Sequence, residues 1–321
     1  MNAPSSKRRV LLAGHVMPAL EAELKATYDC EVLSDQADPA AYIAARGNDY
    51  DVLVTSKYGA DAALIDSLPK LKAIVHFGVG YDNVDVRAAA RRGVTVSNTP
   101  DVLNDCVADL AMGLLIDTVR GISASDRFVR RGEWTKQQFP LTTRLSGRRL
   151  GIAGLGRIGR TIAKRASGFD MDIRYFARNP VQGVPYGHEP SLAELAKWCD
   201  FLVVIVAGGA PTRHLVSADV IKALGPDGYL INVSRGSVVD EAALVDALAN
   251  NRIAGAGLDV FQDEPKVPAA LMDLDNVVLL PHIASGTRET RKAMADLVAA
   301  NLKSFFENGR LVTPVPAPAA A

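Results

Sequence analysis

Three glycines in one short turn constrain the fold of this chain more than any other feature. The segment Gly154-Leu155-Gly156-Arg157-Ile158-Gly159 has the spacing G-x-G-x-x-G and stands between the apolar run 150–153 and the helix-like run 160–166. In such a strand-turn-helix unit the first glycine permits the tight turn, the second lets the backbone approach a pyrophosphate, and the third lets the helix pack against the strand. The helix N-terminus then attracts the phosphate charge. We therefore expect a parallel α/β sheet that binds a dinucleotide, rather than an ordinary structural turn.

The end of the next predicted strand indicates which dinucleotide fits. Strand 171–176 is followed by Ala177, Arg178 and Asn179, where an NAD-binding sheet usually carries an Asp or Glu for the ribose 2′-hydroxyl. Asp172 lies at the start of this strand, about 15 Å from its other end at roughly 3.3 Å per residue, and is too far away to serve. The two-pronged guanidinium of Arg178 suits a 2′-phosphate, although a solvated surface charge is its alternative interpretation. We predict a preference for NADP(H), with NAD(H) as the second choice.

Length and composition suit two globular domains and argue against several classes of partner. The 321 residues are 48% hydrophobic, and 36 basic side chains balance 36 acidic ones. A net charge of zero gives no overall field that favours nucleic acid or an anionic membrane, and no run approaches the roughly 20 apolar residues that span a bilayer. Cys30, Cys106 and Cys199 are too few and too widely spaced for a disulfide framework or a metal site. We expect reduced thiols in a cytoplasmic protein, with no bound metal.

The sequence patterns at the two ends of the chain also lead to predictions. The basic and apolar stretch 7–13 resembles the start of a secretory signal, but Gly14, His15 and Pro18 interrupt it, so we interpret it as a first strand and turn. The tail 313–321 is rich in proline and alanine and is expected to be disordered.

Short apolar runs alternate with helical patterns on both sides of the glycine turn. They lie at 10–13, 30–33, 52–55, 73–77 and 94–96 before the turn, and at 173–176, 201–206, 229–233, 256–260 and 277–280 after it. Such alternation is typical of parallel strands joined by crossover helices. We predict two doubly wound, Rossmann-like α/β domains with a cleft between them. Residues 1–98 and 284–321 would form the substrate-binding domain, including the last helix at 288–308, and residues 99–283 would form the dinucleotide-binding domain.

One connection is unusually long for a compact domain. A helix-like run at 107–120 is followed by residues 127–143, which show little periodicity. A long connection without regular structure is uncommon and is usually functional. We expect the range 105–145 to form an arm that reaches a second copy of the chain in a homodimer. Trp134 in this arm would either close the partner's site or simply pack in the interface.

Three residues with ionisable side chains follow late strands at their carboxyl ends, where open α/β sheets hold ligands. They are Arg235, Glu264 and His282. Singly, each has an ordinary alternative: a solvated arginine, a turn carboxylate before proline, and a hydrogen-bonded structural histidine. Together, beside a nicotinamide cofactor, they predict an acid–base site.

These residues belong to a series of motifs that resembles the D-isomer-specific 2-hydroxyacid dehydrogenases over almost the whole chain. The matching segments are 78–82, 98–100, the glycine turn, 232–236, 257–265 and 281–282. Within that family the segments 139–142 and 177–178 are most similar to NADP-dependent glyoxylate, hydroxypyruvate and hydroxyphenylpyruvate reductases. The resemblance therefore implies a reductase of small 2-oxoacids.

The resemblance also assigns roles to residues. His282 would protonate the substrate carbonyl oxygen, Glu264 would favour the protonated imidazole, and Arg235 would bind the substrate carboxylate. Backbone amides of Val79 and Gly80 would hold the same carboxylate. The cofactor would contact the glycine turn, residues 177–179, and Val206, Val233, Ser234, Arg235, Asp259 and His282. Asp259 would accept from the nicotinamide carboxamide, and its alternative is a turn-forming role.

Several alternatives remain open. The chain could be an NAD(H)-dependent dehydrogenase for an arylpyruvate, D-lactate or 3-phosphoglycerate, and residues 57–59 after a predicted strand could line the substrate site. Formate dehydrogenases resemble this pattern but carry glutamine in place of Glu264. A nucleotide-sensing corepressor, from a different class, would keep the fold and the cofactor without turnover.

Overall fold

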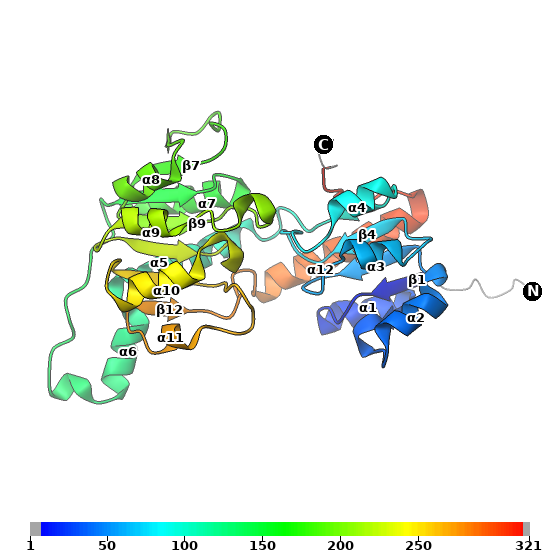
Figure 1. Cartoon of the computed structure of the whole chain (residues 1–321), viewed down its shortest axis with the longest axis horizontal. Helices are drawn as coiled ribbons and strands as arrows, with labels where there is room; N and C mark the ends of the chain where they lie inside the picture. The colour runs from blue at the N-terminus through cyan, green and yellow to red at the C-terminus, as the bar shows by residue number, and fades with distance from the viewer. Residues whose placement is uncertain (1–7, 317–321) are drawn as a thin grey trace, which may run out of the picture. The chain divides into compact units, whose positions relative to one another are not determined.

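The computed structural model describes residues 8–316 and divides into two compact units (Figure 1). The five-stranded unit comprises Met1–Leu103 and Arg288–Ala321, and the seven-stranded unit comprises Asn104–Thr287. The divisions fall a few residues after the expected boundaries at 98 and 283. Both units are α/β units built on a parallel sheet, which confirms the predicted fold class. The expectation of a disordered tail is wrong for residues 313–316, since the N–H of Val315 donates to the carbonyl of Val96 at 2.8 Å. Residues 317–321 lie outside the described residues.

The five-stranded unit has the strand order β2-β1-β3-β4-β5, all parallel. Its strands are β1 (Arg9–Leu12), β2 (Asp29–Val32), β3 (Val52–Thr55), β4 (Ala73–His76) and β5 (Thr95–Ser97). Its α-helices are α1 (Pro18–Thr27), α2 (Pro39–Arg46), α3 (Ala62–Asp66), α4 (Val86–Arg91) and α12 (Arg288–Asn308). Strand β1 lies within the stretch 7–13 that resembled the start of a secretory signal, as the interpretation of that stretch as a first strand requires.

Helices cover both faces of this sheet because successive strand residues point to opposite sides. Leu11 and Leu53 face the core shared with α2, α3 and α4, whereas Val10 and Val52 face the core shared with α1 and α12. In that second core Val298 of α12 is fully buried, so the last helix completes the sheet that the first strand began. Within residues 8–316 no helix is long and apolar enough to cross a membrane.

The seven-stranded unit has the order β12-β11-β10-β9-β6-β7-β8, again all parallel. Its strands are β6 (Arg149–Ala153), β7 (Asp172–Phe176), β8 (Gly187–His188), β9 (Phe201–Val204), β10 (Tyr229–Asn232), β11 (Gly255–Leu258) and β12 (Val277–Leu279). Its α-helices are α5 (Asn104–Arg120), α6 (Ile122–Arg130), α7 (Arg157–Ala166), α8 (Leu192–Trp198), α9 (Ala218–Leu224), α10 (Glu241–Ala249) and α11 (Ala269–Met272). The two-residue strand β8 was not expected, because it is too short to show a period.

The direction of winding reverses at the centre of this sheet. Strand β6 has β7 on one side and β9 on the other, and the chain passes from β7 and β8 back across the sheet to reach β9. Ile152 and Val203 face α5 and α7, while Ala153 and Val204 face α8, α9 and α10. Open α/β sheets bind ligands outside the carboxyl ends of the strands at such a reversal.

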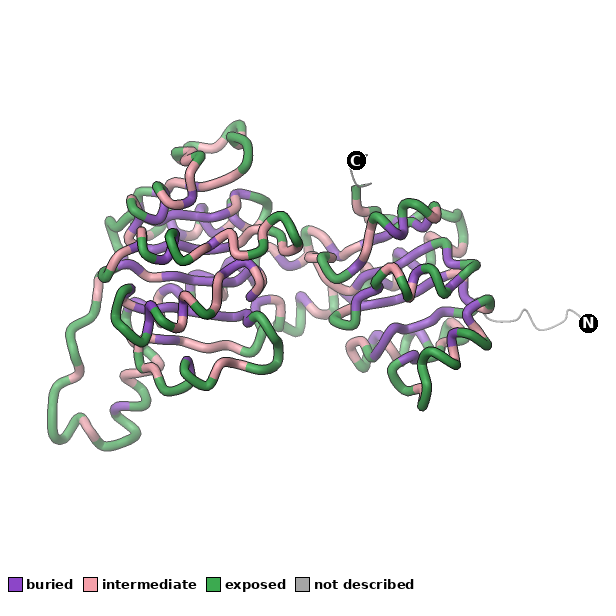
Figure 2. Tube along the Cα trace, in the orientation of Figure 1, coloured by how far each residue is buried: buried purple, intermediate pink, exposed green. Residues whose placement is uncertain are grey.

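The expected arm contains more regular structure than its sequence indicated. Helix α5 packs into the core with Ala108 and Leu115 fully buried, so the segment that leaves the body of the unit begins at Gly121 (Figures 1 and 2). Helix α6 extends to Arg130, inside the range expected to be irregular, and its Phe128 packs edge-on against Phe139 at 5.4 Å between ring centroids. The apolar face of α6 is thus covered in part by Phe139, which lies in the segment that leads back to β6.

Candidate active site

The glycine turn after β6 has the geometry that a dinucleotide requires. Gly154 has a φ of +105°, which disfavours any residue with a side chain, and a Cβ on Gly159 would lie 2.1 Å from the carbonyl oxygen of Gly154. A Cβ on Gly156 would meet nothing within 4 Å, so the backbone is open to a ligand there. Gly156 is also the N-cap of α7 and supplies no side-chain cap, and the N-terminus of a helix in this position attracts the charge of a pyrophosphate.

The segment that was expected to select the cofactor lies beside this turn. Ala153 pairs with Phe176 at the carboxyl ends of β6 and β7, and the N–H of Gly154 donates to the carbonyl of Phe176 at 2.9 Å. Arg178 follows two residues later and is exposed. Within residues 8–316 its guanidinium and its backbone N–H have no hydrogen-bond or ion-pair partner. The donor set of this segment therefore fits an anionic group on the adenosine ribose.

Arg235 is positioned by a buried polar network at the carboxyl end of β10. Asn232, only 1% exposed, accepts from the N–H of Ser234 at 3.1 Å and donates to the carbonyl of Arg235 at 3.0 Å. The hydroxyl of Ser234 donates to the carbonyl of Val206, which follows the neighbouring strand β9. Because both amide groups of Asn232 are used, the turn that carries Arg235 has a fixed conformation.

His282 and Glu264 form a hydrogen-bonded pair. His282 Nδ1 lies 2.8 Å from Glu264 Oε2, and the other oxygen of Glu264 accepts from the N–H of Phe261 at 3.1 Å. An ionised carboxylate can only accept, so Nδ1 carries the hydrogen and Nε2 is left for a ligand. Burial would raise the pKa of Glu264, but the hydrogen bond and charge of His282, with the Phe261 N–H and the charge of Arg235, lower it below its usual value. Ionised Glu264 thus accepts the Nδ1 hydrogen of His282 and orients the ring.

Asp259 holds the loop on which His282 stands. Its fully buried carboxylate accepts from the N–H of Ile283 at 2.7 Å and from the N–H of Ala284 at 2.9 Å. Its carbonyl accepts from the N–H of His282, whose φ of +54° lies in the left-handed region. Burial raises the pKa of Asp259, and the two backbone N–H groups oppose that increase. Both carboxylate oxygens therefore serve the loop, in line with the structural alternative for this residue, and each retains a lone pair for a ligand.

The loop that carries Glu264 is supported by two contacts that the sequence did not reveal. A Cβ on Gly236 would lie 1.9 Å from the carbonyl carbon of Phe261, so this backbone rests directly on the glycine. The N–H of Gln262 donates to Glu241 Oε2 at 2.9 Å, and Glu241 begins α10. In the sequence, Gly236 is an ordinary glycine in a turn and Glu241 an ordinary carboxylate at the start of a helix. Neither pattern predicts a contact with the loop of Glu264.

In the five-stranded unit, a turn after β4 directs its carbonyl groups inward. The carbonyl of Gly78 accepts from the N–H of Thr99 at 2.9 Å, and that of Val79 accepts from the side-chain amide of Asn98 at 2.8 Å. The carbonyl of Gly80 lies 3.0 Å from His76 Nε2. Since the C=O and N–H of a trans peptide point in opposite directions, the N–H groups that follow these carbonyls face outward. Successive outward N–H groups form a concavity for an anion.

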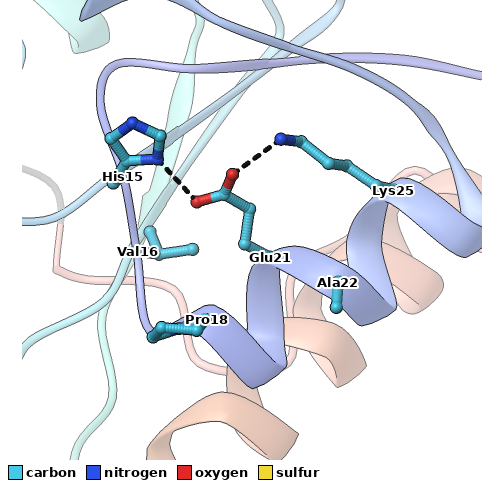
Figure 3. Close-up of a pocket in the computed structure, with 6 residues that line it drawn as sticks. All are labelled: His15, Val16, Pro18, Glu21, Ala22 and Lys25. Carbon is cyan, nitrogen blue, oxygen red and sulfur yellow. Dashed lines mark hydrogen bonds and ion pairs between the residues drawn. The ribbon is translucent and has the colours of Figure 1, made fainter.

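A hollow of about 390 Å³ also lies in the five-stranded unit, and Figure 3 shows its lining side chains. Its polar groups bind one another: His15 Nδ1 lies 3.0 Å from Glu21 Oε2, and Lys25 donates to Glu21 Oε1 at 2.7 Å. The hydrogen bond to Glu21 and the charge of Asp35 raise the pKa of His15. None of the expected site residues lines this hollow, so we leave it outside the candidate site.

Comparison with known proteins gives the family. The model of the "D-isomer specific 2-hydroxyacid dehydrogenase, NAD binding domain" family matches residues 112–284. The chain belongs to this family. As predicted, it is an NAD(P)-dependent oxidoreductase that acts on the CH–OH group of D-2-hydroxyacids.

Relatives of this dehydrogenase match most of its length. It is 52% identical over 82% of its chain to a hydroxyphenylpyruvate reductase of Plectranthus scutellarioides, of which 84% is covered. It is 48% identical to a glyoxylate/hydroxypyruvate reductase of Arabidopsis thaliana, with the same two shares covered. A solved NADPH-dependent glyoxylate/hydroxypyruvate reductase of Sinorhizobium meliloti, in complex with NADP and malonate, is 46% identical with a TM-score of 0.91, covering 98% of this chain and 100% of that one.

Most of the expected site residues of the dehydrogenase lie in the seven-stranded unit, and a few lie in the five-stranded unit. The glycine turn and Arg178 lie in the seven-stranded unit, together with Arg235, Glu264 and His282. All follow the carboxyl ends of strands in a single parallel sheet. The turn at 78–80 lies in the five-stranded unit, as do residues 57–59, and Trp134 is 63% exposed on the arm.

Proposed function

We propose that this dehydrogenase reduces small 2-oxoacids to D-2-hydroxyacids and prefers NADPH as the reductant. The observation that carries the proposal is the hydrogen bond between His282 Nδ1 and Glu264, which leaves Nε2 as a proton donor at the carboxyl edge of the sheet that bears the glycine turn. Bound NADPH would supply the hydride. The family and the relatives support the reaction class.

His282 is the proposed general acid. A carbonyl oxygen that gains negative charge as its carbon is reduced needs a positioned proton, and Glu264 orients the imidazole that would supply it. When the reaction runs backward, the same Nε2 accepts the proton from the hydroxyl group. Asp259 fixes the backbone of this loop, and we also propose that its remaining lone pairs accept from the nicotinamide carboxamide.

Arg235 and the turn at 78–80 are the proposed carboxylate-binding groups. Asn232 fixes the backbone of Arg235, and the guanidinium offers two parallel donors to a carboxylate. In the turn, Thr99 holds the carbonyl of Gly78 and Asn98 holds that of Val79, which favours outward N–H groups at Val79 and Gly80. These donors suit a substrate that carries a carboxylate next to its carbonyl group.

The preference for NADPH rests on Arg178. Its free guanidinium and the absence of a carboxylate among residues 177–179 favour a 2′-phosphate over a 2′-hydroxyl. We expect the variant Arg178→Ala to lose about 10- to 100-fold in kcat/KM with NADPH and to change little with NADH. Arg91→Ala, at an exposed arginine of the five-stranded unit, is the control and should change neither value. A wild-type kcat/KM that is higher with NADH would contradict the preference.

The substrate is tested with a panel of oxoacids. We propose glyoxylate and hydroxypyruvate as the best substrates, and 4-hydroxyphenylpyruvate and 2-ketogluconate belong in the panel because relatives are named for them. NADPH oxidation would be followed for each, and chiral analysis of every product except achiral glycolate should give the D-hydroxyacid. His282→Ala should abolish turnover and retain NADPH binding. Tight NADPH binding by the wild type with no oxidation by any oxoacid would favour a binding protein instead.

We also propose a cytoplasmic homodimer in which the arm contacts the second copy. Four apolar side chains of the arm are at least half exposed, namely Ile122, Val129, Trp134 and Leu141. A second copy would cover them, and the free thiols of the three cysteines suit a reducing compartment. Light scattering of the wild type should give a dimer. The double variant Val129→Lys and Leu141→Lys should give a monomer, and an unchanged dimer would exclude the arm as the interface.

A further inference from the structure

We infer that His188 is the positioning residue that sets the preference for a ribose 2′-phosphate, by fixing the peptide that carries Arg178. This inference rests on the proposed NADPH preference. The residue lies in β8, the edge strand that pairs Tyr175 with His188 and Arg174 with Gly187. It stands ten residues beyond Arg178 along the chain, at the other end of the loop that follows β7 (Figure 1).

His188 holds the backbone immediately before Arg178. Its Nε2 lies 3.0 Å from the carbonyl oxygen of Ala177. A carbonyl can only accept, so Nε2 carries the hydrogen and donates it. Because the peptide between Ala177 and Arg178 is trans and planar, its N–H points away from the side on which His188 holds its C=O. The N–H of Arg178 thereby stays free to donate to a ligand.

The imidazole is itself held in place. The rings of His188 and Tyr175 lie 5.2 Å apart at an interplanar angle of 45°. Tyr175 is 1% exposed, and its hydroxyl accepts from the N–H of Val181 at 2.8 Å, within the same loop. The N–H of Glu189 donates to the carbonyl of Tyr175 at 2.8 Å. These contacts hold the loop against the edge of the sheet. The Nε2–H of His188 therefore donates from a fixed position.

Positioning matters here because Arg178 has no other support. Its side chain is exposed and has no partner within residues 8–316, so only its backbone defines where the guanidinium starts. An arginine side chain loses much rotamer freedom when it binds a ligand. A fixed backbone limits the conformations that Arg178 has before binding, so less conformational entropy is lost when the ligand binds. A 2′-phosphate would receive the N–H and the guanidinium of the same residue. A 2′-hydroxyl, which carries no charge, would gain little from either donor.

Two ligands that differ only in the 2′-phosphate test this inference directly. Calorimetric titration would give the dissociation constants of adenosine 2′,5′-bisphosphate and of 5′-AMP. The dissociation constant of 5′-AMP divided by that of the bisphosphate measures the contribution of the 2′-phosphate, and this quotient is the ratio compared below. His188→Phe keeps a ring on Tyr175 and removes the donor, whereas His188→Gln keeps a donor of similar reach. We expect the ratio to fall about three- to tenfold in His188→Phe. It should stay near the wild-type value in His188→Gln, and 5′-AMP binding should change less than twofold in both.

Coupling to Arg178 separates positioning from general destabilisation. In an Arg178→Ala background, His188→Phe should cause a smaller further loss than in the wild type, because only the backbone N–H of residue 178 is left for the histidine to position. A wild-type ratio in His188→Phe, or additive losses in the double variant, would overturn the role of His188 while leaving the NADPH preference intact. A wild-type protein that binds both ligands equally would overturn the NADPH preference and this inference with it. Melting temperatures of all variants would confirm that they are folded, and His188→Leu, which also lacks a donor, replaces His188→Phe in the comparison if His188→Phe does not fold.

Discussion

The variant Gly236→Ala tests whether the support of the Glu264 loop governs activity. Its added Cβ would lie 1.9 Å from the carbonyl carbon of Phe261 and 2.1 Å from the oxygen. Ordinary contact begins near 3.4 Å, so the loop must move by about 1.5 Å. If Glu264 moves with it, the 2.8 Å hydrogen bond to His282 is lost. A misplacement of about 1 Å costs on the order of 100-fold in rate, so we expect kcat/KM for 2-oxoacid reduction to fall about 100-fold.

A double-variant comparison shows whether this loss passes through Glu264. In a Glu264→Gln background, Gly236→Ala should cost far less than 100-fold, because the pair that it disrupts has already been changed. Gly168→Ala is the control: Gly168 is exposed, its φ is not positive, and a Cβ there meets nothing within 4 Å. Binding of NADPH and the melting temperature would be measured alongside the kinetics. Equal losses in the two backgrounds, with all variants folded, would refute the reasoning.

Three further outcomes are expected. Glu264→Gln replaces a carboxylate whose pKa is lowered by the hydrogen bond and charge of His282, so the decline of reductase kcat/KM at alkaline pH should move to lower pH; an unchanged profile would show that the pair is uncoupled. Asn98→Ala frees the carbonyl of Val79, so KM for the oxoacid should rise about three- to tenfold with little change in kcat, and a selective loss of kcat would count against a binding role. Burial raises the pKa of Cys199 to about 12, so iodoacetamide at pH 8 should leave it unmodified until denaturant is added, as peptide mass spectrometry would show.

Local patterns in the sequence were sufficient for the fold class and for the residues at strand ends. The glycine turn and the apolar runs specify strands and crossovers because those signals are short-range, and the structure has a strand at each of them. The motif residues Glu264 and His282 are 18 positions apart, and the structure brings them into hydrogen-bond contact. The family resemblance predicted this pair, whereas periodicity alone gave only two separate strand ends.

The contacts that support the Glu264 loop and Arg178 were not predictable from the sequence. They join segments that are distant along the chain, and no local pattern links such segments. Gly236 touches the backbone of Phe261, and Glu241 binds the N–H of Gln262, across more than 20 residues in each case. His188 lies in a two-residue strand that has no period to detect. The helix α6 differs, because its nine residues are amphipathic along the sequence and only its packing against Phe139 joins distant segments.

The position of α12 affects the order in which this protein can fold during synthesis. One face of the first sheet, including Val10 and Val52, shares its core with Val298 and Leu302 near the end of the chain. At roughly 5–20 residues per second, about 10–40 s separate the emergence of β5 from that of α12. The seven-stranded unit is continuous in sequence and can complete its core within that interval. During the same time the apolar face of the first sheet stays exposed, because α12 has not yet been synthesised. Ribosome-bound chains of intermediate length should therefore be the form most dependent on chaperones.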